Sequence, residues 1–371
     1  FDETVEYCIK EDDIYYIIFT SGSTGIPKGV QISFSALNKF LNWSITLGDS
    51  KIFKENKVFL NQAPFSFDLS VMDLYTCLFS GGTLWAIDKK VQENFSILFE
   101  SLKNSDLNIW VSTPSFASMC LINKDFDKNL LQNVELFFFC GEVLTNKTAL
   151  ELMKRFPNTI ILNTYGPTES TVAMTQIILT EEILNSYNPL PVGFIKPGTD
   201  VKIINEDGEE VINGEKGEIY IFGDTLSSGY LNNYEHNQKS FSYFKNKQCY
   251  KTGDEGYFKD NMLFYCGRVD FQVKLHGYRI ELGDIENNIL KIKNVKSCVV
   301  LPNEVNGIVK NLIAYIVINS NKLNEYDLSQ IIRKELEKNI PLYMIPSRYV
   351  FLDYLPMTNN GKVDRKKLKE Y

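Results

Sequence analysis

The sequence predicts an α/β protein with a mainly parallel sheet, followed by antiparallel strands and a small α+β unit. Three observations support this. Up to about residue 190, short apolar runs of strand length alternate with segments of helical periodicity. From about Pro191, short strands and glycine-rich turns dominate, and after Asp270 a few helices and strands alternate again. We therefore expect three regions: residues 1–190, 191–269 and 270–371.

The apolar patterns place the expected elements in order. A buried strand is expected at 14–19, and further strands at 57–61, 83–87, 107–112, 134–140, 159–163, 201–204, 217–222, 263–267, 297–301 and 312–318. Helices are expected after Ser33, a suitable N-cap, and at 69–79, 146–155, 283–290 and 328–338, with Gly81 and Gly82 ending the second. Ligands bind beyond the carboxyl ends of parallel strands, where segments 20–29, 140–142 and 163–169 are expected to lie.

Composition excludes several classes of function. The chain has 371 residues and a net charge of −7, which argues against general binding to nucleic acids or anionic membranes. No apolar stretch has the length of a transmembrane helix. Seven scattered cysteines without a Cys-x-x-Cys pair predict reduced thiols and a cytoplasmic protein. With two histidines, a zinc site or a Ser-His-Asp triad is not expected.

The most informative segment is Thr20–Gly29, with three glycines, four hydroxyl side chains and one lysine. Glycines let backbone N–H groups converge on an anion, and Lys28 adds a charge suited to phosphate. The segment is not a Walker A loop, because Pro27 stands where the second glycine is required and Gly29 follows the lysine. The alternative is an ordinary Gly/Ser turn between a strand and a helix.

Other polar segments follow strands. Asn163–Glu169 offers Tyr165 to stack on an adenine, Thr168 to meet a phosphate and Glu169 to hold Mg²⁺; alternatively it is a Gly-Pro turn before a helix capped by Thr168. Asp254 offers a carboxylate for ribose hydroxyls, with Arg268 as a guanidinium nearby. Each is by itself compatible with a turn residue or a solvated charge. Lys362, on a probable loop, is by itself compatible with an exposed lysine of the tail.

Together and in this order, these segments resemble the adenylate-forming superfamily of acyl-CoA synthetases, luciferases and peptide-synthetase adenylation domains. The resemblance rests on Thr20–Gly29, Asn163–Glu169, Tyr250–Asp254, Gly267–Glu281 and Asn360–Asp364, which span nearly the whole chain. Gln272, Lys274, Gly277, Arg279 and Glu281 fit the amino-acid-activating branch. Within that branch, residues 61–73, 112–116, 139–144, 341–346 and 356–362 resemble the D-alanine:D-alanyl carrier protein ligases, which begin the D-alanylation of teichoic acids.

The resemblance implies an adenylate-forming fold: a large α/β domain with a β subdomain, a hinge at Asp270 and a small α+β C-terminal lid. It implies that ATP is bound by Thr20, Ser21, Gly22, Thr24, Lys28, Asn163, Thr164, Tyr165, Gly166, Pro167, Thr168, Asp254, Tyr265, Cys266, Gly267 and Arg268. Family members carry more than a hundred residues before the phosphate loop, and here nineteen precede it. We therefore expect an N-terminal part of the large domain to be missing from this chain.

The resemblance also implies a reaction. ATP, with Mg²⁺ held by Glu169, activates D-alanine, and the product is passed to the phosphopantetheine thiol of a D-alanyl carrier protein. Lys362 is the expected catalytic cation, and Asp68, Cys140, Val172 and Lys362 would contact D-alanine. The residues alone favour Asp68 as an N-cap for the helix that follows it, and the resemblance reverses that preference. The alternatives are an adenylation domain for another small amino acid, an acyl-CoA-type ligase, or a non-catalytic fragment that binds a carrier protein.

Overall fold

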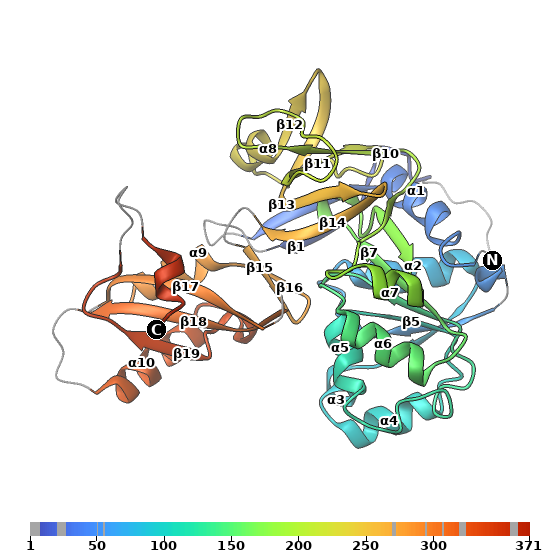
Figure 1. Cartoon of the computed structure of the whole chain (residues 1–371), viewed down its shortest axis with the longest axis horizontal. Helices are drawn as coiled ribbons and strands as arrows, with labels where there is room; N and C mark the ends of the chain where they lie inside the picture. The colour runs from blue at the N-terminus through green and yellow to red at the C-terminus, as the bar shows by residue number, and fades with distance from the viewer. Residues whose placement is uncertain are drawn as a thin grey trace. The chain divides into compact units, whose positions relative to one another are not determined.

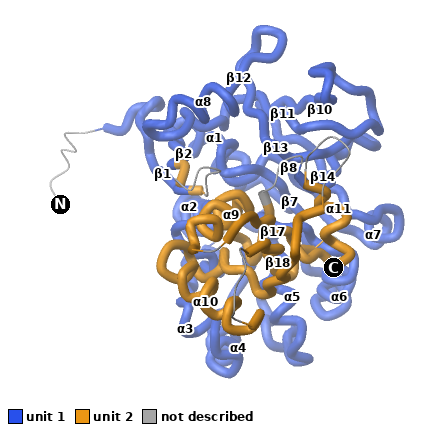
Figure 2. Tube along the Cα trace, turned by 90° about the vertical axis from the view of Figure 1, so that its left-hand side faces the viewer, with its two compact units in different colours: residues 1–19, 29–269 blue, residues 20–28, 270–371 orange. Residues whose placement is uncertain are grey.

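The computed structural model describes residues 8–20, 27–49, 51–54, 56–268, 272–293, 295–305, 308–318, 324–356 and 363–371. The chain divides into two compact units (Figure 2). Unit 1 comprises residues 1–19 and 29–269, and unit 2 comprises residues 20–28 and 270–371. Each unit has a hydrophobic core of its own. In the part of the chain that is described, no helix is long and apolar enough to cross a membrane.

A seven-stranded sheet forms the centre of the α/β part of unit 1 (Figure 1). Its strand order is β4 (Thr83–Ala86), β3 (Val58–Asn61), β5 (Ile109–Ser112), β6 (Leu136–Phe139), β7 (Ile160–Tyr165), β8 (Thr175–Ile178) and β9 (Phe194–Ile195). The first five strands are parallel, as the alternating pattern predicts. The last two, which the sequence reasoning did not expect, pair antiparallel.

The sheet is buried on both faces because its strands are apolar at successive positions. In β6, Leu136 and Phe138 belong to one hydrophobic cluster, and Phe137 and Phe139 belong to another. Side chains of a strand alternate between faces, so each cluster fills one side of the sheet. The first cluster includes residues of α1 (Phe34–Ser44) and α2 (Leu69–Ser80), and the second includes residues of α4 (Phe95–Lys103), α5 (Pro114–Cys120) and α6 (Asn146–Arg155).

Helix ends follow the expected chemistry. Ser33 caps α1, since its side-chain oxygen accepts a hydrogen bond from the backbone N–H of Ala36. Gly81 ends α2 with a φ of 70°, in the left-handed region that glycine tolerates. Two very short helices, α3 (Lys89–Gln92) and α7 (Glu181–Ser186), were not predicted, and neither were α4 and α5.

The strand predicted at 14–19 is present, but the prediction that it is buried is wrong. β1 (Ile14–Thr20) forms a two-stranded sheet with β2 (Lys28–Ser33), apart from the seven-stranded sheet. Ile18 is buried, but Phe19 is 59% exposed. Strands of a parallel sheet are covered on both faces, but β1 is not part of that sheet, so its apolar run does not ensure burial. Because β1 does not belong to the seven-stranded sheet, segment 20–29 does not follow a strand of the parallel sheet, contrary to expectation.

The later part of unit 1 is an antiparallel sheet, as the glycine-rich turns predict. It consists of β10 (Thr199–Ile204), β11 (Gly217–Gly223), β13 (Lys247–Lys259), β12 (Phe241–Phe244) and β14 (Met262–Arg268), the last pairing with β13. The helix α8 (Tyr234–Ser240) directly precedes β12. The bend between β11 and α8, residues 224–233, contributes to the site described below.

Unit 2 contains two small sheets, three α-helices and the short 3₁₀ helix η3 (Leu342–Met344) among its described residues. β15 (Gln272–Leu275) pairs with β16 (Tyr278–Glu281), and β17 (Val295–Val305), β18 (Ile308–Ile318) and β19 (Arg348–Phe351) form a three-stranded sheet. The α-helices are α9 (Leu282–Leu290), α10 (Glu325–Glu337) and α11 (Arg365–Leu368). Ile285, Val300, Ile316 and Ile332 are among the residues of its core.

Candidate active site

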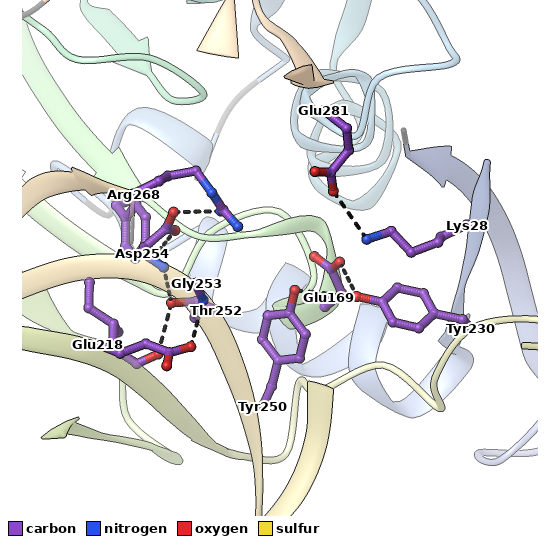
Figure 3. A network of polar contacts seen from close by, with 12 residues as sticks. Lys28, Glu169, Glu218, Tyr230, Tyr250, Thr252, Gly253, Asp254, Arg268 and Glu281 are labelled. Atoms are coloured by element: carbon purple, nitrogen blue, oxygen red, sulfur yellow. Dashed lines mark hydrogen bonds and ion pairs between the residues drawn. The ribbon is translucent and has the colours of Figure 1, made fainter. Parts of the chain in front are cut away.

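Three predicted site residues from three separate motifs meet in unit 1. The hydroxyl group of Tyr165, at the end of β7, donates a hydrogen bond of 2.5 Å to Asp254 Oδ2. Arg268 Nη1, at the end of β14, lies 2.6 Å from Asp254 Oδ1 (Figure 3). Both oxygens of one carboxylate are therefore bound, one by a phenol and one by a guanidinium. We call these three residues the Tyr–Asp–Arg cluster.

The β13 backbone holds Asp254 in place before any ligand arrives. Its N–H donates to Thr252 Oγ1 at 2.9 Å, and the Thr252 hydroxyl donates to the backbone oxygen of Ile219 on β11. The N–H of Gly253 donates to Glu218 Oε1 at 2.8 Å, with Gly253 at a φ of 69°. A glycine adopts this left-handed conformation without steric cost, so the strand bends at Gly253 and presents Asp254 to Tyr165.

Burial makes the Tyr–Asp–Arg cluster an electrostatic unit. The side chains of Asp254 and Arg268 are 1% and 6% exposed. Burial, and then the negative charge of Asp254, raise the pKa of Tyr165 well above its usual value. Tyr165 is therefore a neutral hydrogen-bond donor at neutral pH. The centroid of the Tyr265 ring lies 5.7 Å from that of Tyr165, so a second aromatic side chain lies beside the one that binds the carboxylate.

Glu169 lies in the short 3₁₀ helix η2 (Thr168–Ser170) that follows β7, and it is fully buried. Its Oε1 accepts a hydrogen bond of 2.7 Å from the hydroxyl of Tyr230 (Figure 3). Its backbone oxygen accepts one of 2.8 Å from the N–H of Ser227. Sequence reasoning singled out Glu169 but missed Tyr230, which lies sixty-one residues further along the chain.

Only the three-residue 3₁₀ helix η2 follows the Gly-Pro turn, and its N-cap is Pro167 without a side-chain cap, so the alternative of a helix capped by Thr168 is wrong. Instead, Thr171 and Val172 have φ angles of 60° and 67°, a left-handed conformation that is strained for β-branched residues. The buried hydroxyl of Thr171 donates to the backbone oxygen of Thr225 at 2.7 Å and fixes the turn. A Cβ on Gly166 would come within 2.6 Å of Ala173 Cα, so this close packing requires a glycine.

Two predicted substrate residues are in contact with each other. Cys140 Sγ, directly after β6, donates to the backbone oxygen of Val172 at 3.7 Å. Both residues are buried. The next residue, Gly141, has a φ of 93°, and a Cβ there would lie 3.0 Å from Phe67 Cζ. Cys140, Gly141, Val172 and Phe67 thus form a wall of small and apolar groups, which we call the Cys–Val wall.

Asp68, next to Phe67, is buried and precedes α2, but its side chain does not cap the helix. The N-cap alternative is therefore wrong for this residue. Its φ and ψ of −66° and −14° are helical, whereas a capping residue normally has extended backbone angles. Burial, and then the negative charge of Asp68, raise the pKa of Tyr16 well above its usual value, so the charge of Asp68 acts on the Tyr16 hydroxyl.

The remaining predicted residues have other partners or positions in the fold, or lie outside the described residues. Asn163 Nδ2 donates to the oxygen of Pro191, and Thr164 Oγ1 donates to that of Phe139, which ties β7 to its neighbours. In unit 2, Lys28 Nζ lies 3.5 Å from Glu281 Oε1. Thr20 Oγ1 donates to the backbone oxygen of Lys28 at 3.5 Å. Pro167 is the N-cap of η2, Thr168 begins it, and Cys266 and Gly267 lie in β14. Ser21, Gly22, Thr24, Asp270 and Lys362 lie outside the described residues.

The residues present fit a magnesium ion bound together with a nucleotide. Within the described ranges, no group of three or more His, Cys, Asp or Glu side chains could hold a metal. Mg²⁺ is usually bound by one or two carboxylates together with substrate phosphates, rather than by a cage of protein ligands. A single buried carboxylate such as Glu169 meets that requirement.

Comparison with known proteins decides the family. The model of the AMP-binding enzyme family matches residues 2–231, and that of the AMP-binding enzyme C-terminal domain matches residues 284–362. The chain belongs to the AMP-binding enzyme family. It is an ATP-using enzyme with the adenylate-forming fold, as the sequence resemblance implied.

Curated relatives narrow the similarity. The D-alanine–D-alanyl carrier protein ligase of Listeria welshimeri is 49% identical over 365 residues, covering 98% of this chain and 71% of the relative. The ligase of the same name from Bacillus licheniformis is 50% identical over 363 residues, covering 98% and 72%. These matches confirm the resemblance to this group of ligases.

Solved structures agree on the fold. The Vibrio cholerae adenylation domain AlmE, in complex with glycyl-adenosine-5'-phosphate, has a TM-score of 0.84 and is 26% identical, covering 99% of this chain and 68% of AlmE. The o-succinylbenzoate CoA synthetase MenE of Bacillus subtilis has a TM-score of 0.82 at 20% identity, covering 98% and 70%. The second similarity shows the fold alone.

Proposed function

We propose that the protein joins D-alanine to AMP and passes the D-alanyl group to the phosphopantetheine thiol of a carrier protein. A carboxylate oxygen of D-alanine attacks the α-phosphorus of ATP and displaces pyrophosphate. The thiol then gives up its proton to water, and its sulfur attacks the carbonyl carbon of D-alanyl-AMP to form a thioester, while AMP leaves with the electron pair of the broken C–O bond. The Tyr–Asp–Arg cluster, which unites three motifs in one buried contact, is the observation that carries this proposal.

The cluster suits a ribose. A carboxylate has about four lone-pair sites, and Tyr165 and Arg268 use one on each oxygen of Asp254. The two residues therefore orient the carboxylate without exhausting its capacity to accept hydrogen bonds from ribose hydroxyls. The rings of Tyr165 and Tyr265 offer aromatic surface for the adenine.

Glu169 is the residue that would hold Mg²⁺, and the ion would supply positive charge next to the phosphates. The other residues predicted to bind ATP are proposed to do so here: Thr20, Ser21, Gly22, Thr24, Lys28, Asn163, Thr164, Gly166, Pro167, Thr168, Cys266 and Gly267. A glycine-rich backbone and hydroxyl groups suit the departing pyrophosphate, because their N–H and O–H groups can donate several hydrogen bonds to one anion.

The Cys–Val wall and Asp68 suit a small amino acid. Asp68 is a buried carboxylate, and a buried carboxylate binds the ammonium group of an amino acid more strongly than an exposed one does. Phe67 packs closely on Gly141, and Cys140 contacts Val172, so these residues form a compact apolar surface that suits a methyl group. We therefore assign Asp68 to the ammonium group, and Cys140 and Val172 to the walls that face the methyl group.

Lys362 is proposed to bridge the substrate carboxylate and the α-phosphate during the first step. We further propose domains at 1–190, 191–269 and 270–371, with a hinge at Asp270 that lets the C-terminal lid rotate between the two steps. The division into compact units between residues 269 and 270 supports that boundary. Seven free thiols support a cytoplasmic location.

Pyrophosphate exchange with a panel of amino acids tests the function. The protein is expected to incorporate labelled pyrophosphate into ATP with D-alanine, and about 10- to 200-fold less efficiently with L-alanine, the range that methyl-scale discrimination allows. A preference for glycine or another small amino acid would favour the adenylation-domain alternative. No exchange with any amino acid would favour a non-catalytic carrier-binding protein.

Two variants test the assigned roles. Asp68→Asn should lower D-alanine-dependent exchange by about 100-fold or more, because a buried ion pair loses one partner, while ATP binding stays intact. Unchanged exchange would place the ammonium elsewhere. Cys140→Ala should change the D/L preference more than ATP binding, and an unaltered preference would remove Cys140 from the wall that selects the substrate.

Lys362→Ala should reduce pyrophosphate exchange by about 100-fold, since removing one preorganised charge costs about 3 kcal/mol of barrier. Thioester formation from supplied D-alanyl-AMP should largely survive, because that step does not involve the α-phosphate of ATP. An equal loss of both half-reactions would contradict the proposed role.

A further inference from the structure

The contacts of Tyr230 are not explained by packing alone. Tyr230 is 2% exposed, and its ring packs edge-on against Phe241, with centroids 5.5 Å apart. Yet its hydroxyl donates a hydrogen bond of 2.7 Å to Glu169 Oε1, and it lies 3.5 Å from the hydroxyl of Tyr250. Figure 3 shows both phenol groups directed toward the Glu169 carboxylate. A buried hydroxyl that binds a buried carboxylate fixes the direction of that carboxylate.

The backbone of Tyr230 is itself held at both polar groups. Its N–H donates to Asn237 Oδ1 at 2.6 Å, and its oxygen accepts from Asn237 Nδ2 at 2.9 Å. The preceding Gly229 has a φ of 102°, and a Cβ there would lie 2.8 Å from Asn237 Oδ1. One amide side chain from α8 thus clamps the bend in which Tyr230 lies.

The same bend pairs with the strand that leaves the Gly/Ser loop. Val30 of β2 and Tyr230 form an antiparallel bridge. Around it, the N–H of Gln31 donates to the oxygen of Gly229 at 3.0 Å, and the N–H of Leu231 donates to that of Gly29 at 2.8 Å. The segment 227–231 therefore contacts Glu169 through a side chain and a backbone N–H, and contacts β2 through the backbone.

We propose that Tyr230 is a positioning residue: its hydroxyl fixes the Glu169 carboxylate for the metal ion that accompanies ATP, and it anchors that carboxylate to the strand leaving the phosphate loop. This inference rests on the proposed function, in which Glu169 holds Mg²⁺. A glutamate has three side-chain torsions to order, so a hydrogen bond made in advance reduces the cost of presenting its oxygen.

The test is the dependence of ATP binding on Mg²⁺, measured by calorimetry without amino acid so that no turnover occurs. Tyr230→Phe keeps the ring and removes the hydroxyl. The factor by which Mg²⁺ strengthens ATP binding should fall about tenfold. That factor corresponds to the lower end of the free energies contributed by hydrogen bonds to charged groups. Binding of ATP in EDTA should stay within about twofold of the unsubstituted protein.

Three further variants complete the design. Tyr243→Phe, on β12 and 74% exposed, is the matched control and should leave the Mg²⁺ factor unchanged. Asn237→Ala loosens the bend from outside and should lower the factor in the same direction by less. Glu169→Gln should abolish most of it, and if it does not, the proposed metal role of Glu169 fails, and with it this inference.

Two outcomes would overturn the role of Tyr230 while leaving the proposed function standing. One is an unchanged Mg²⁺ factor in Tyr230→Phe when Glu169→Gln has lost it. The other is an equal loss of ATP binding in Mg²⁺ and in EDTA, which would mean that the hydroxyl supports the fold rather than the carboxylate.

Discussion

Two tyrosine–aspartate pairs of unit 1 have nearly the same hydrogen bond but different surroundings. Tyr165 donates to Asp254 at 2.5 Å in the interior, and Tyr187 donates to Asp260 at 2.6 Å at the surface. The buried carboxylate also binds Arg268, whereas near the exposed pair Lys259 Nζ lies 5.5 Å from the Tyr187 ring centroid. Burial raises the pKa of Tyr165 most, while for Tyr187 the hydrogen bond to Asp260 is the largest cause.

The difference shows that bond length alone does not identify a functional contact. Water competes for an exposed carboxylate, so the pair at the surface adds little stability. In the interior the carboxylate must be satisfied by its partners, and removing one of them leaves a charge uncompensated. The buried pair is therefore the one that can hold a ligand group in a fixed place, and the exposed pair provides a control.

The largest effect is expected from the charge at the centre of the buried pair. Asp254→Asn should lower the free energy of unfolding by about 3 kcal/mol or more, because Arg268 stays buried without its carboxylate. AMP binding should weaken as well. Urea denaturation measures the first and calorimetry the second. Asp260→Asn should leave stability and AMP binding unchanged within error. Equal losses in the two variants would contradict the difference between the buried and the exposed pair.

A smaller effect is expected from the hydroxyl groups. Tyr165→Phe should cost about 1.5 to 3 kcal/mol of stability, because Asp254 loses a hydrogen bond to a buried charge. The ring remains, so contacts with Tyr265 and with an adenine should survive. The comparison is Tyr187→Phe, whose unfolding midpoint in urea should not move. If the midpoints of both variants shift alike, burial is not the deciding factor.

The smallest effect should appear at alkaline pH. Above pH 10 an unfolded tyrosine loses its proton, while Tyr165 keeps it because its folded pKa is raised. The unfolded state then binds fewer protons than the folded state, so stability is full below pH 10 and falls as pH rises above it. Denaturation between pH 9 and 11 should show a shallower fall for Tyr165→Phe than for the unsubstituted protein.

Much of the fold was predictable because apolar runs of strand length could be read locally. The five parallel strands and the helix over 146–155 follow from such patterns. The exposure of β1 was not predictable, because it depends on which strands pair, and the residues 14–19 have the same apolar pattern as a buried strand. β8 and β9 were missed because a four-residue and a two-residue strand carry too short a pattern to detect.

The site was predictable where short motifs carry their own chemistry. Tyr165 ends β7 and Arg268 ends β14, whereas Asp254 lies within β13, and the structure brings the three together. Tyr230 and Asn237 could not be found in this way, because their role arises from a long-range contact between a bend and a turn. Thr171 was also missed, since a left-handed threonine gives no signal in composition or periodicity.

The most direct test of one site that joins an amino acid to AMP is the binding of a stable sulfamate analogue of D-alanyl-AMP. By calorimetry, it should bind about 100-fold more tightly than AMP or better, because it engages the Tyr–Asp–Arg cluster and Asp68 together. Asp68→Asn should erase that gain while leaving AMP binding unchanged. An analogue that binds no more tightly than AMP would contradict the account.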